Sequence, residues 1–514
     1  MIASIRSRRT PLAVAFATAL AATSLSPTQG MSAPDNTWVR IRSDPARRIF
    51  AQFPTRYSRS APAPAATWPV VNCADSGAGS LRAAIGAAGD GDTIDLTALT
   101  CGTITLQTGA IPVRRNNLTL IGPGRSALTI DGNATDRVFI HPGRGTLTLR
   151  AMTIQNGRNR ATGFNVAGGG CVASAAYVAL EDATVRNCYA GGEGAYGGAI
   201  YAYSLTLSNS TLSGNVANGV HEDAGTAAFG GAAFVYQMQF TDSTVTGNRA
   251  EHRVKPGRTS YDIAGGVIAV RGGSIAGSTI DSNVSQGRAG GIAAFNSISV
   301  SNSTISGNVA ASEIGGGLFL RWPATIDLGN STITANHAEA GGGGIWLAMP
   351  SANLQSSIVF GNSTGGGQFA ELQDPAALTI SGGGNLIGTS GPNVALPAGT
   401  LNTDPLLGVL ADNGGPTRTH ALLRGSPAVD VGNNSANLSF DQRGAGYPRV
   451  YGAAADIGAF EQQALPFVQT PVPTLSQWMM ALLAGLLAAL ASGTQARQRQ
   501  RRDTRVDSRS SGVP

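Results

Sequence analysis

Internal repetition is the feature that most limits what this chain can fold into, and it fills the middle of the sequence. Apolar residues recur eight times at three positions, which we call j, j+2 and j+7. Successive j+2 residues lie 25 to 35 residues apart, the length of one solenoid coil with a variable loop. The triplets are Leu147/Leu149/Ile154, Val178/Leu180/Val185, Leu205/Leu207/Leu212, Met238/Phe240/Val245, Gly273/Ile275/Ile280, Ile298/Val300/Ile305, Ile326/Leu328/Ile333 and Ala352/Leu354/Val359.

The spacing within a triplet indicates a strand, a corner and a second strand. A spacing of two buries one face of a strand, whereas the odd step to j+7 would turn the last side chain outward unless the chain bends. Polar stretches such as Ser208-Asn209-Ser210-Thr211 suit that bend. Runs of glycine precede most of the apolar strands, and an asparagine follows each triplet. Asparagine tolerates the left-handed conformation, and stacked amides can form a hydrogen-bonded ladder. These residues are Asn156, Asn187, Asn215, Asn248, Asn283, Asn308, Asn336 and Asn362.

A coil of three short strands cannot bury its apolar face alone, but stacked coils share one continuous core. The sequence therefore predicts an all-β fold, a right-handed parallel β-helix of the pectate-lyase-like kind, with an N-terminal cap and a C-terminal membrane helix. Leucine-rich repeats have similar periods, but no helical segment lies between these strands. A propeller needs four strands per blade and repeats of about 40 residues or more.

The N-terminal end has the features of an export signal. Arg6, Arg8 and Arg9 precede a short apolar run from Leu12 to Ala22, too short for a membrane anchor. We assign residues 1–33 to a signal peptide and 34–66 to a Pro/Arg-rich linker. Basic charge is concentrated in the two ends of the chain, so the body carries no footprint for nucleic acid.

Four cysteines in an exported chain are compatible with two disulfides. The local pairings are Cys73 with Cys101 and Cys171 with Cys188, and free buried thiols are the alternative. A metal site is disfavoured because no CxxC occurs and the five histidines are scattered.

Residues 67–140 contain motifs that resemble the CSLREA-type domain that opens many bacterial β-helical surface proteins. Ser80 to Ala88 is predicted to form a short helix with Ser80 as N-cap, which would plug the open end of the solenoid. The Cys and Glu of the family motif are missing here. The matching residues are Gly79-Ser80-Leu81-Arg82-Ala83-Ala84-Ile85 and Gly91-Asp92-Thr93-Ile94.

After the repeats at 141–370, residues 371–461 resemble the choice-of-anchor Q module, which precedes different kinds of C-terminal anchor. The match is spread over Asn402 to Glu461 and includes 404–408 (DPLLG), 410–417 (LADNGGPT), 425–430 (GSPAVD), 441–444 (DQRG) and 456–461 (DIGAFE). Its acidic residues could bind Ca²⁺, but such residues more often fix turns beside Gly and Pro. They are Asp404, Asp412, Asp430, Asp441, Asp456 and Glu461.

A linker at 462–471 leads to residues 472–514, which resemble an IPTL-type sorting signal. An apolar stretch, 478–491, and then an arginine-rich tail follow the motif, as expected for membrane placement with the arginines inside. The resemblance implies cleavage by an exosortase-type protease at the surface of a Gram-negative bacterium. A permanent anchor is the alternative. The motif residues are Val472, Pro473, Thr474, Leu475, Ser476 and Trp478.

No catalytic constellation is recognisable in the coils. Glycoside hydrolysis requires converging carboxylates, and neither an adjacent Asp pair nor a Gly-His-Gly occurs there. We expect no catalytic residues, and no cofactor apart from the Ca²⁺ alternative. A polysaccharide lyase or hydrolase acting on the flank of the β-helix remains the second hypothesis, by fold analogy alone.

Two long loops, 216–229 and 249–264, are predicted to leave the same corner of adjacent coils. Their charged and aromatic residues form the best candidate for a binding surface, with a glycan or another surface ligand as partner. A solvated loop without a ligand is the alternative, and a metal held by the histidines and acids is a weaker one. The residues are His221, Glu222, Asp223, Glu251, His252, Arg253, Tyr261 and Asp262. The sequence thus predicts a structural or adhesive protein of the cell surface.

Overall fold

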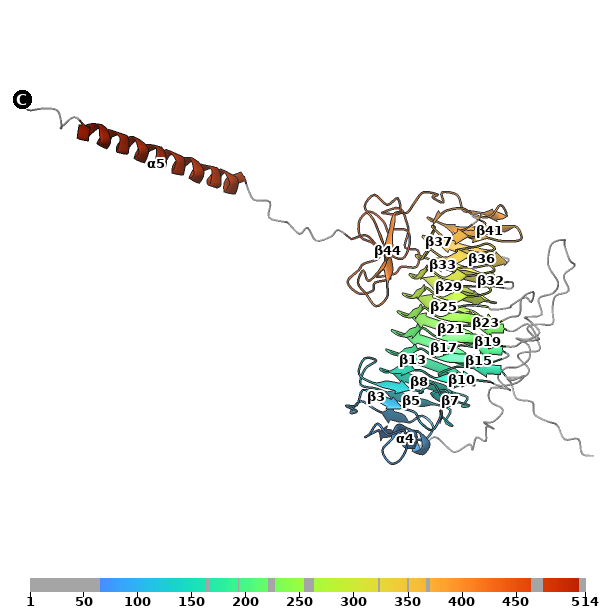
Figure 1. Ribbon diagram of the computed structural model, residues 1–514. Helices are drawn as coiled ribbons and strands as arrows, with labels where there is room; N and C mark the ends of the chain where they lie inside the picture. Colours follow the sequence, from blue (N-terminus) through green and yellow to red (C-terminus); the bar gives the residue numbers. More distant parts are fainter. Residues whose placement is uncertain are drawn as a thin grey trace, which may run out of the picture. The chain divides into compact units, whose positions relative to one another are not determined.

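The computed structural model describes residues 65–161, 166–192, 194–220, 227–253, 263–321, 324–348, 351–366, 370–463 and 475–507. The described residues from 65 to 462 belong to one unit, and the described residues from 463 onward belong to a second. The first unit is the predicted parallel β-helix, with successive coils stacked in sequence order from β8 to β37 (Figure 1).

The j and j+2 residues lie on the strands of face 1, the first of four faces of the coil. Every strand of this face pairs in parallel with its neighbours. The strands are β1 (Thr67–Pro69), β2 (Thr93–Asp95), β5 (Leu118–Ile121), β8 (Thr146–Arg150), β13 (Tyr177–Glu181), the second halves of β17 (Ile200–Ser208) and β21 (Ala233–Thr241), β25 (Gly273–Ala276), β29 (Ile298–Ser301), β33 (Thr325–Gly329), β37 (Ser351–Gln355), β41 (Leu378–Gly383) and β43 (Val394–Ala395).

Face 2 carries the j+7 residues in a sheet of 11 parallel strands. A corner separates it from face 1, as the odd spacing predicts. The strands are β3 (Thr103–Thr105), β6 (Thr129–Asp131), β9 (Thr153–Gln155), β14 (Thr184–Arg186), β18 (Thr211–Ser213), β22 (Thr244–Thr246), β26 (Thr279–Asp281), β30 (Thr304–Ser306), β34 (Thr332–Thr334), β38 (Ile358–Val359) and β42 (Leu386–Ile387).

Face 3 follows the ladder asparagines, and its sheet has eight strands. They are β10 (Arg158–Arg160), β15 (Tyr189–Gly192), β19 (Val216–Val220), β23 (Arg249–Arg253), β27 (Val284–Ser285), β31 (Val309–Ala310), β35 (His337–Ala338) and β39 (Ser363–Thr364).

Face 4 was not foreseen, because the sequence predicted three strands in a coil. Most of its strands, such as β24 and β28, are buried on both sides, so they show no polar alternation and read as short apolar runs after glycine. They are β4 (Ile111–Pro112), β7 (Phe139–His141), β12 (Val172–Ser174), the first halves of β17 and β21, β24 (Val267–Ala269), β28 (Ile292–Ala294), β32 (Leu318–Arg321), β36 (Ile345–Ala348) and β40 (Leu372–Gln373).

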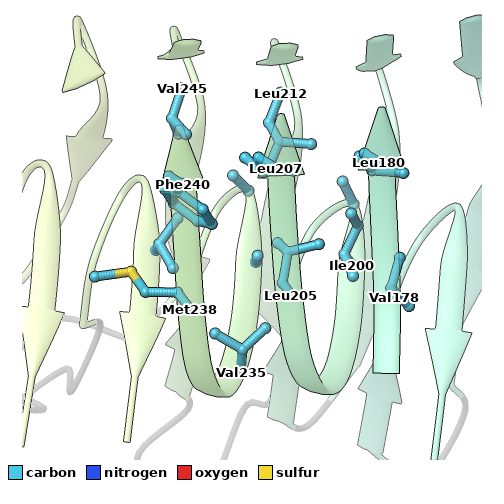
Figure 2. Close-up of a cluster of buried hydrophobic side chains, with 14 of the residues drawn as sticks. Val178, Leu180, Ile200, Leu205, Leu207, Leu212, Val235, Met238, Phe240 and Val245 are labelled. Carbon is cyan, nitrogen blue, oxygen red and sulfur yellow. The ribbon is translucent and has the colours of Figure 1, made fainter. Parts of the chain in front are cut away.

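The predicted triplets form the core. Figure 2 shows Val178, Leu205 and Met238 at equivalent positions of adjacent coils, with Leu180, Leu207 and Phe240 two residues further on. These side chains are buried in one continuous apolar cluster. Burying a large aliphatic side chain contributes roughly 1.5–3 kcal/mol, so stacking of the coils stabilises the fold in proportion to their number.

An asparagine ladder runs along the corner between faces 2 and 3. The side-chain amide of Asn283 donates to Oδ1 of Asn308 at 2.9 Å, and Asn308 donates in the same way to Asn336 at 2.9 Å. The ladder asparagines from Asn215 to Asn362 are all buried. The left-handed residue is the one before each of these asparagines, for example Gly307 at φ +65°. In the first two coils Asn156 and Asn187 take that left-handed place themselves, so the predicted conformation holds only there.

A second ladder, of serines, runs along the corner between faces 1 and 2. The backbone N–H of Ser278 donates to Oγ of Ser303 at 3.1 Å, and that hydroxyl donates to the carbonyl of Ser301 at 2.7 Å. The same arrangement recurs from Ser210 to Ser357. The residue before each serine, such as Asn302 at φ +51°, is left-handed. At both corners the ladder side chains therefore satisfy buried backbone N–H groups from coil to coil.

The N-terminal end is closed by α4 (Leu81–Ala87), whose N-cap is Ser80 as predicted. Leu81 and Ile85 are buried in the main core. Arg82 donates to the carbonyls of Gly109 and Ala110 at 2.7 and 2.9 Å, which ties the helix to the coil above it. Both predicted disulfides, Cys73–Cys101 and Cys171–Cys188, are present.

The parallel coil continues past residue 370, through β43, before the chain turns back. Residues from 404 to 462 then pack against the outside of face 2 and contribute one antiparallel hairpin, β44 (Leu407–Ala411) with β45 (Thr419–Leu422). Gln442 is central to this docking and fully buried. It accepts from Thr304 Oγ1 at 2.6 Å and donates to Thr279 Oγ1 at 2.9 Å. We call residues 404–462 the docked module.

We expect Asn308→Ala to destabilise the β-helix by about 3 kcal/mol or more. The substitution leaves the buried N–H of Asn283 without its acceptor and removes the side-chain hydrogen bonds to Ile280 and Asn336, and a lost buried hydrogen bond costs roughly 1–3 kcal/mol. Guanidinium unfolding of the full chain measures the effect. Asn296→Ala, at an exposed position, is the matched control and should change stability by less than about 0.5 kcal/mol. Equal effects of the two would contradict a structural ladder.

We expect Gln442→Ala to loosen the docked module and leave the coils intact. The change strips partners from several buried hydroxyl and carbonyl groups at once, a loss of roughly 2–3 kcal/mol. Limited proteolysis should then cut within 404–462 first. Gln239→Ala, exposed on face 1, should leave the digestion pattern unchanged.

Candidate functional site

The predicted binding loops begin as strands of face 3. Residues 216–220 and 249–253 are β19 and β23, which pair in parallel from Val216↔Arg249 to Val220↔Arg253. The prediction of two loops at the same corner of adjacent coils is thus right about their place and wrong about their start. Where two neighbouring coils both have a long insertion, the first residues of the insertions continue the parallel pairing of face 3, as β19 and β23 do.

A second small sheet lies against these extended strands. It consists of β11 (Val166–Gly168), β16 (Gly194–Tyr196) and β20 (Ala227–Phe229), all parallel. Ala195, Ala217, Ala228 and Ala250 are buried between the two layers. We call these two packed layers the wing: the face 3 strands β10, β15, β19 and β23, and the small sheet of β11, β16 and β20.

Three of the predicted binding residues, Glu251, His252 and Arg253, are consecutive residues of β23. Glu251 accepts from Arg249 of its own strand, in an ion pair that takes up its charge. The backbone N–H of His252 donates to the side chain of Gln286 at 2.8 Å. His221, Glu222, Asp223, Tyr261 and Asp262 lie outside the described residues. Within the described ranges, no group of three or more His, Cys, Asp or Glu side chains is arranged to hold a metal ion.

The acidic residues considered for Ca²⁺ accept backbone hydrogen bonds in the docked module. Asp404 accepts from Leu406 at 2.8 Å and Asp412 from Gly414 at 3.0 Å, both two residues ahead in Asx turns. Asp430 accepts from Ala453 and Ala454. The turn-forming role that these residue types favour is therefore the one the contacts support.

Three of the other acids belong to a buried ionic network. Arg443 forms an ion pair with Asp441 at 2.6 Å, and its guanidinium lies 3.9 Å from the ring centre of Tyr447 and 3.8 Å from that of Phe460. Fully buried Arg449 pairs with Glu461 at 3.3 Å and donates to the carbonyl of Asp456 at 2.7 Å. Burial raises the pKa of Glu461 to about 7 and lowers that of Arg449. These groups hold the module together.

Glu371 ends the asparagine ladder. Its Oε2 accepts from the side-chain amide of Asn362 at 2.6 Å and from the Asn362 backbone at 3.2 Å, in the place that the next Asn Oδ1 would occupy. Burial raises the pKa of Glu371 to about 7, although the hydrogen bonds from Asn362 and Gly361 lower it. A carboxyl group with such a pKa suits proton transfer only where substrate can reach it, and Glu371 is buried.

One open depression lies on face 1 across β25 to β41, with a volume of about 490 Å³. Serine and threonine side chains lie along it beside Ile298, Ile326 and Ala352. Among its lining residues Asp327 is the single carboxylate, and its Oδ1 accepts from Asn353 at 2.8 Å. Glycoside hydrolysis uses two carboxylates that flank the bond, so this lining does not supply the pair.

The second unit consists of α5 (Leu475–Asp507), in which Leu475, Ser476 and Trp478 of the predicted motif form the first turns. Val472, Pro473 and Thr474 lie outside the described residues, as does the predicted signal peptide. Met479 to Arg499 is long and apolar enough to cross a membrane. Its 21 residues span about 31 Å as a helix, close to the hydrocarbon thickness of about 30 Å.

Comparison with known proteins assigns the C-terminal end. Residues 470–502 match the IPTL-CTERM motif. The sequence comparison with curated proteins found no match. Among solved structures, the crystal structure of pectate lyase Pel9A matches with 13% identity and a TM-score of 0.37, over 82% of this chain and 100% of that chain. This similarity is too low to carry an argument. The IPTL-CTERM match indicates a sorting signal, and with it an exported, anchored protein.

Sequence reasoning missed the docked module's position. The outward row of face 2 is threonine from Thr184 to Thr332 and changes to Ile358 and then Leu386. Those two apolar residues pack with Leu422, Ile457 and Phe460 of the module. Ile358 was the signal in the sequence, because it places an apolar side chain where the preceding coils have an outward-facing threonine.

We expect the stability of the protein to fall as pH rises from about 4.5 to about 7, in part through Glu371. The folded protein holds a proton on this group up to about pH 7, whereas the unfolded chain releases it near 4.5, so stability decreases across that window. Glu371→Gln keeps an acceptor for Asn362 and removes the titration. Unfolding midpoints of wild type and variant over the window should therefore diverge, with the variant having the flatter profile. Glu339→Gln, at an exposed site, should follow the wild type; parallel profiles for all three would refute the assignment.

Proposed function

We propose that this protein is a rigid structural or adhesive rod that displays the wing at the cell surface, and that an exosortase-type protease processes its C-terminal segment. The single observation that carries the proposal is the IPTL-CTERM match at 470–502, which coincides with an apolar helix of membrane-spanning length. A sorting signal is useful to a protein whose body acts outside the membrane.

The body is suited to display. Two hydrogen-bonded corner ladders and a continuous core join each coil to the next, so the coils behave as one stiff unit. The strands of the wing are also paired between coils, so the wing is rigid as well. We include His221, Glu222, Asp223, Glu251, His252, Arg253, Tyr261 and Asp262 in the proposed binding surface, with a surface glycan as the candidate ligand.

The C-terminal tail gives the sharpest test. Cleavage near the motif predicts that mature protein extracted from the cell surface ends close to Ser476 and lacks Arg497 to Arg502. Intact-mass measurement of the extracted protein reads the C-terminus directly. A double variant, Pro473→Ala with Thr474→Ala, should keep the tail and stay in the inner membrane fraction. Ala488→Leu, within the apolar helix, is the control and should be processed normally. A tail retained by the wild-type protein would establish a permanent anchor instead.

A further inference from the structure

We propose that Arg158, Arg160 and Tyr189 on the wing form a binding site for an acidic sugar residue of an extracellular polysaccharide. The proposal rests on surface display, which makes extracellular polymers the available ligands, and it names the ligand class. None of these three residues was among those predicted to bind a ligand.

The two arginines project from the same side of β10 toward one tyrosine. They are two residues apart on a strand, so both side chains face outward, while Asn159 between them is buried. The guanidinium carbons of Arg158 and Arg160 lie 4.7 and 5.8 Å from the ring centre of Tyr189. One aromatic ring thus serves as the support for two cations.

A glycine makes this arrangement possible. Arg158 pairs with Tyr189 across the sheet, and Arg160 pairs with Gly191. A Cβ atom at position 191 would lie 2.5 Å from the Tyr189 hydroxyl oxygen. The ring therefore lies along its own strand over Gly191 and reaches both arginines. Any side chain at 191 would displace the ring.

No carboxylate of the described residues forms an ion pair with either arginine, and Nε of Arg158 has no hydrogen-bond partner among these residues. Other outward-facing arginines are paired, for example Arg150 with Glu181 and Arg249 with Glu251. Two neighbouring guanidinium groups repel each other, and a bound anion removes that cost while accepting charge-assisted hydrogen bonds.

A depression of about 290 Å³ adjoins the pair and is lined by Ala134, Thr135, Asp136, Arg158, Asn159 and Arg160. Its one carboxylate, Asp136, accepts from the backbone N–H groups of Ala110 at 3.2 Å and Arg137 at 2.7 Å. The depression is at the small end of ligand sites, which begin at about 300 Å³. It therefore suits one charged sugar residue rather than a long segment. A densely charged nucleic acid would need a broad basic surface, which two arginines do not provide.

Binding to defined oligosaccharides tests the proposal on the full chain in detergent, by calorimetry at low salt. The probes are an oligoglucuronate, its uncharged methyl ester and a sulfated oligosaccharide of the same length. We expect binding of the oligoglucuronate or the sulfated probe, weakened by added salt, and no binding of the ester. The first two probes distinguish a carboxylate from a sulfate as the recognised group.

Single substitutions test the charges of the two arginines separately from the Tyr189 ring on which they pack. Arg158→Gln and Arg160→Gln should each weaken binding about tenfold or more, the value of a charge-assisted hydrogen bond. Gly191→Val keeps both arginines but displaces Tyr189, and should weaken binding to a similar extent. Arg249→Gln, on the same face but ion-paired, should bind as the wild type does. Circular dichroism melting verifies that each variant is folded.

Several results would overturn the site: equal binding of the methyl ester, wild-type affinity in the Arg158/Arg160 double variant, the same loss in Arg249→Gln, or no binding of either acidic probe. None of them bears on cleavage of the tail, which is measured on the cell-derived protein. A failure of this site therefore stays distinguishable from a failure of surface display.

Discussion

The vertical register between coils is the constraint on which the rest of the structure depends. Each buried asparagine amide spans two coils at once, since it receives from the coil before and donates to the coil after. A shift of one residue would break this ladder and would also point the j and j+2 residues outward. The apolar core supplies most of the driving force and opposes a shift of one residue, but a shift of two residues would keep the same face inward. The directional hydrogen bonds at both corners select one register.

The same register also creates the surface of face 2 on which the docked module packs. Stacked coils present rows of identical residues, and the threonine row of face 2 offers hydroxyl groups at a regular spacing. The docked module uses that row through Gln442 at Thr279 and Thr304 and through the N–H of Ala459 at Thr332. A segment without a regular fold of its own is thus held by a regular template, while its buried Arg443 and Arg449 networks fix its internal shape.

The sequence was informative wherever one residue type repeats at a fixed place in the coil. It predicted the core triplets, the cap helix at Ser80 and the ladder asparagines, because each follows from periodicity or local capping. Face 4 was missed because strands buried on both sides have no alternation to read. The site around Tyr189 was missed for another reason. Arg158 and Tyr189 are 31 positions apart in the sequence, and their pairing depends on coil lengths that vary from repeat to repeat.

The insertions that build the wing lie between the ladder asparagine and the glycine run, and the glycine runs explain why the chain returns to the coil at that point. A Cβ atom on Gly198 would lie 2.5 Å from the carbonyl carbon of Val216, at the start of the face 3 strand in the next coil. Gly231 stands in the same relation to Arg249. The chain therefore leaves the coil after the ladder asparagine and must re-enter through a gap that admits only glycine. Insertions between these two fixed points cannot disturb the core. They can lengthen face 3 outward, as in β19 and β23, where side chains are free to carry charge. The ladder asparagine and the glycine run therefore keep the geometry of the coil constant and at the same time allow the sequence of the wing to vary.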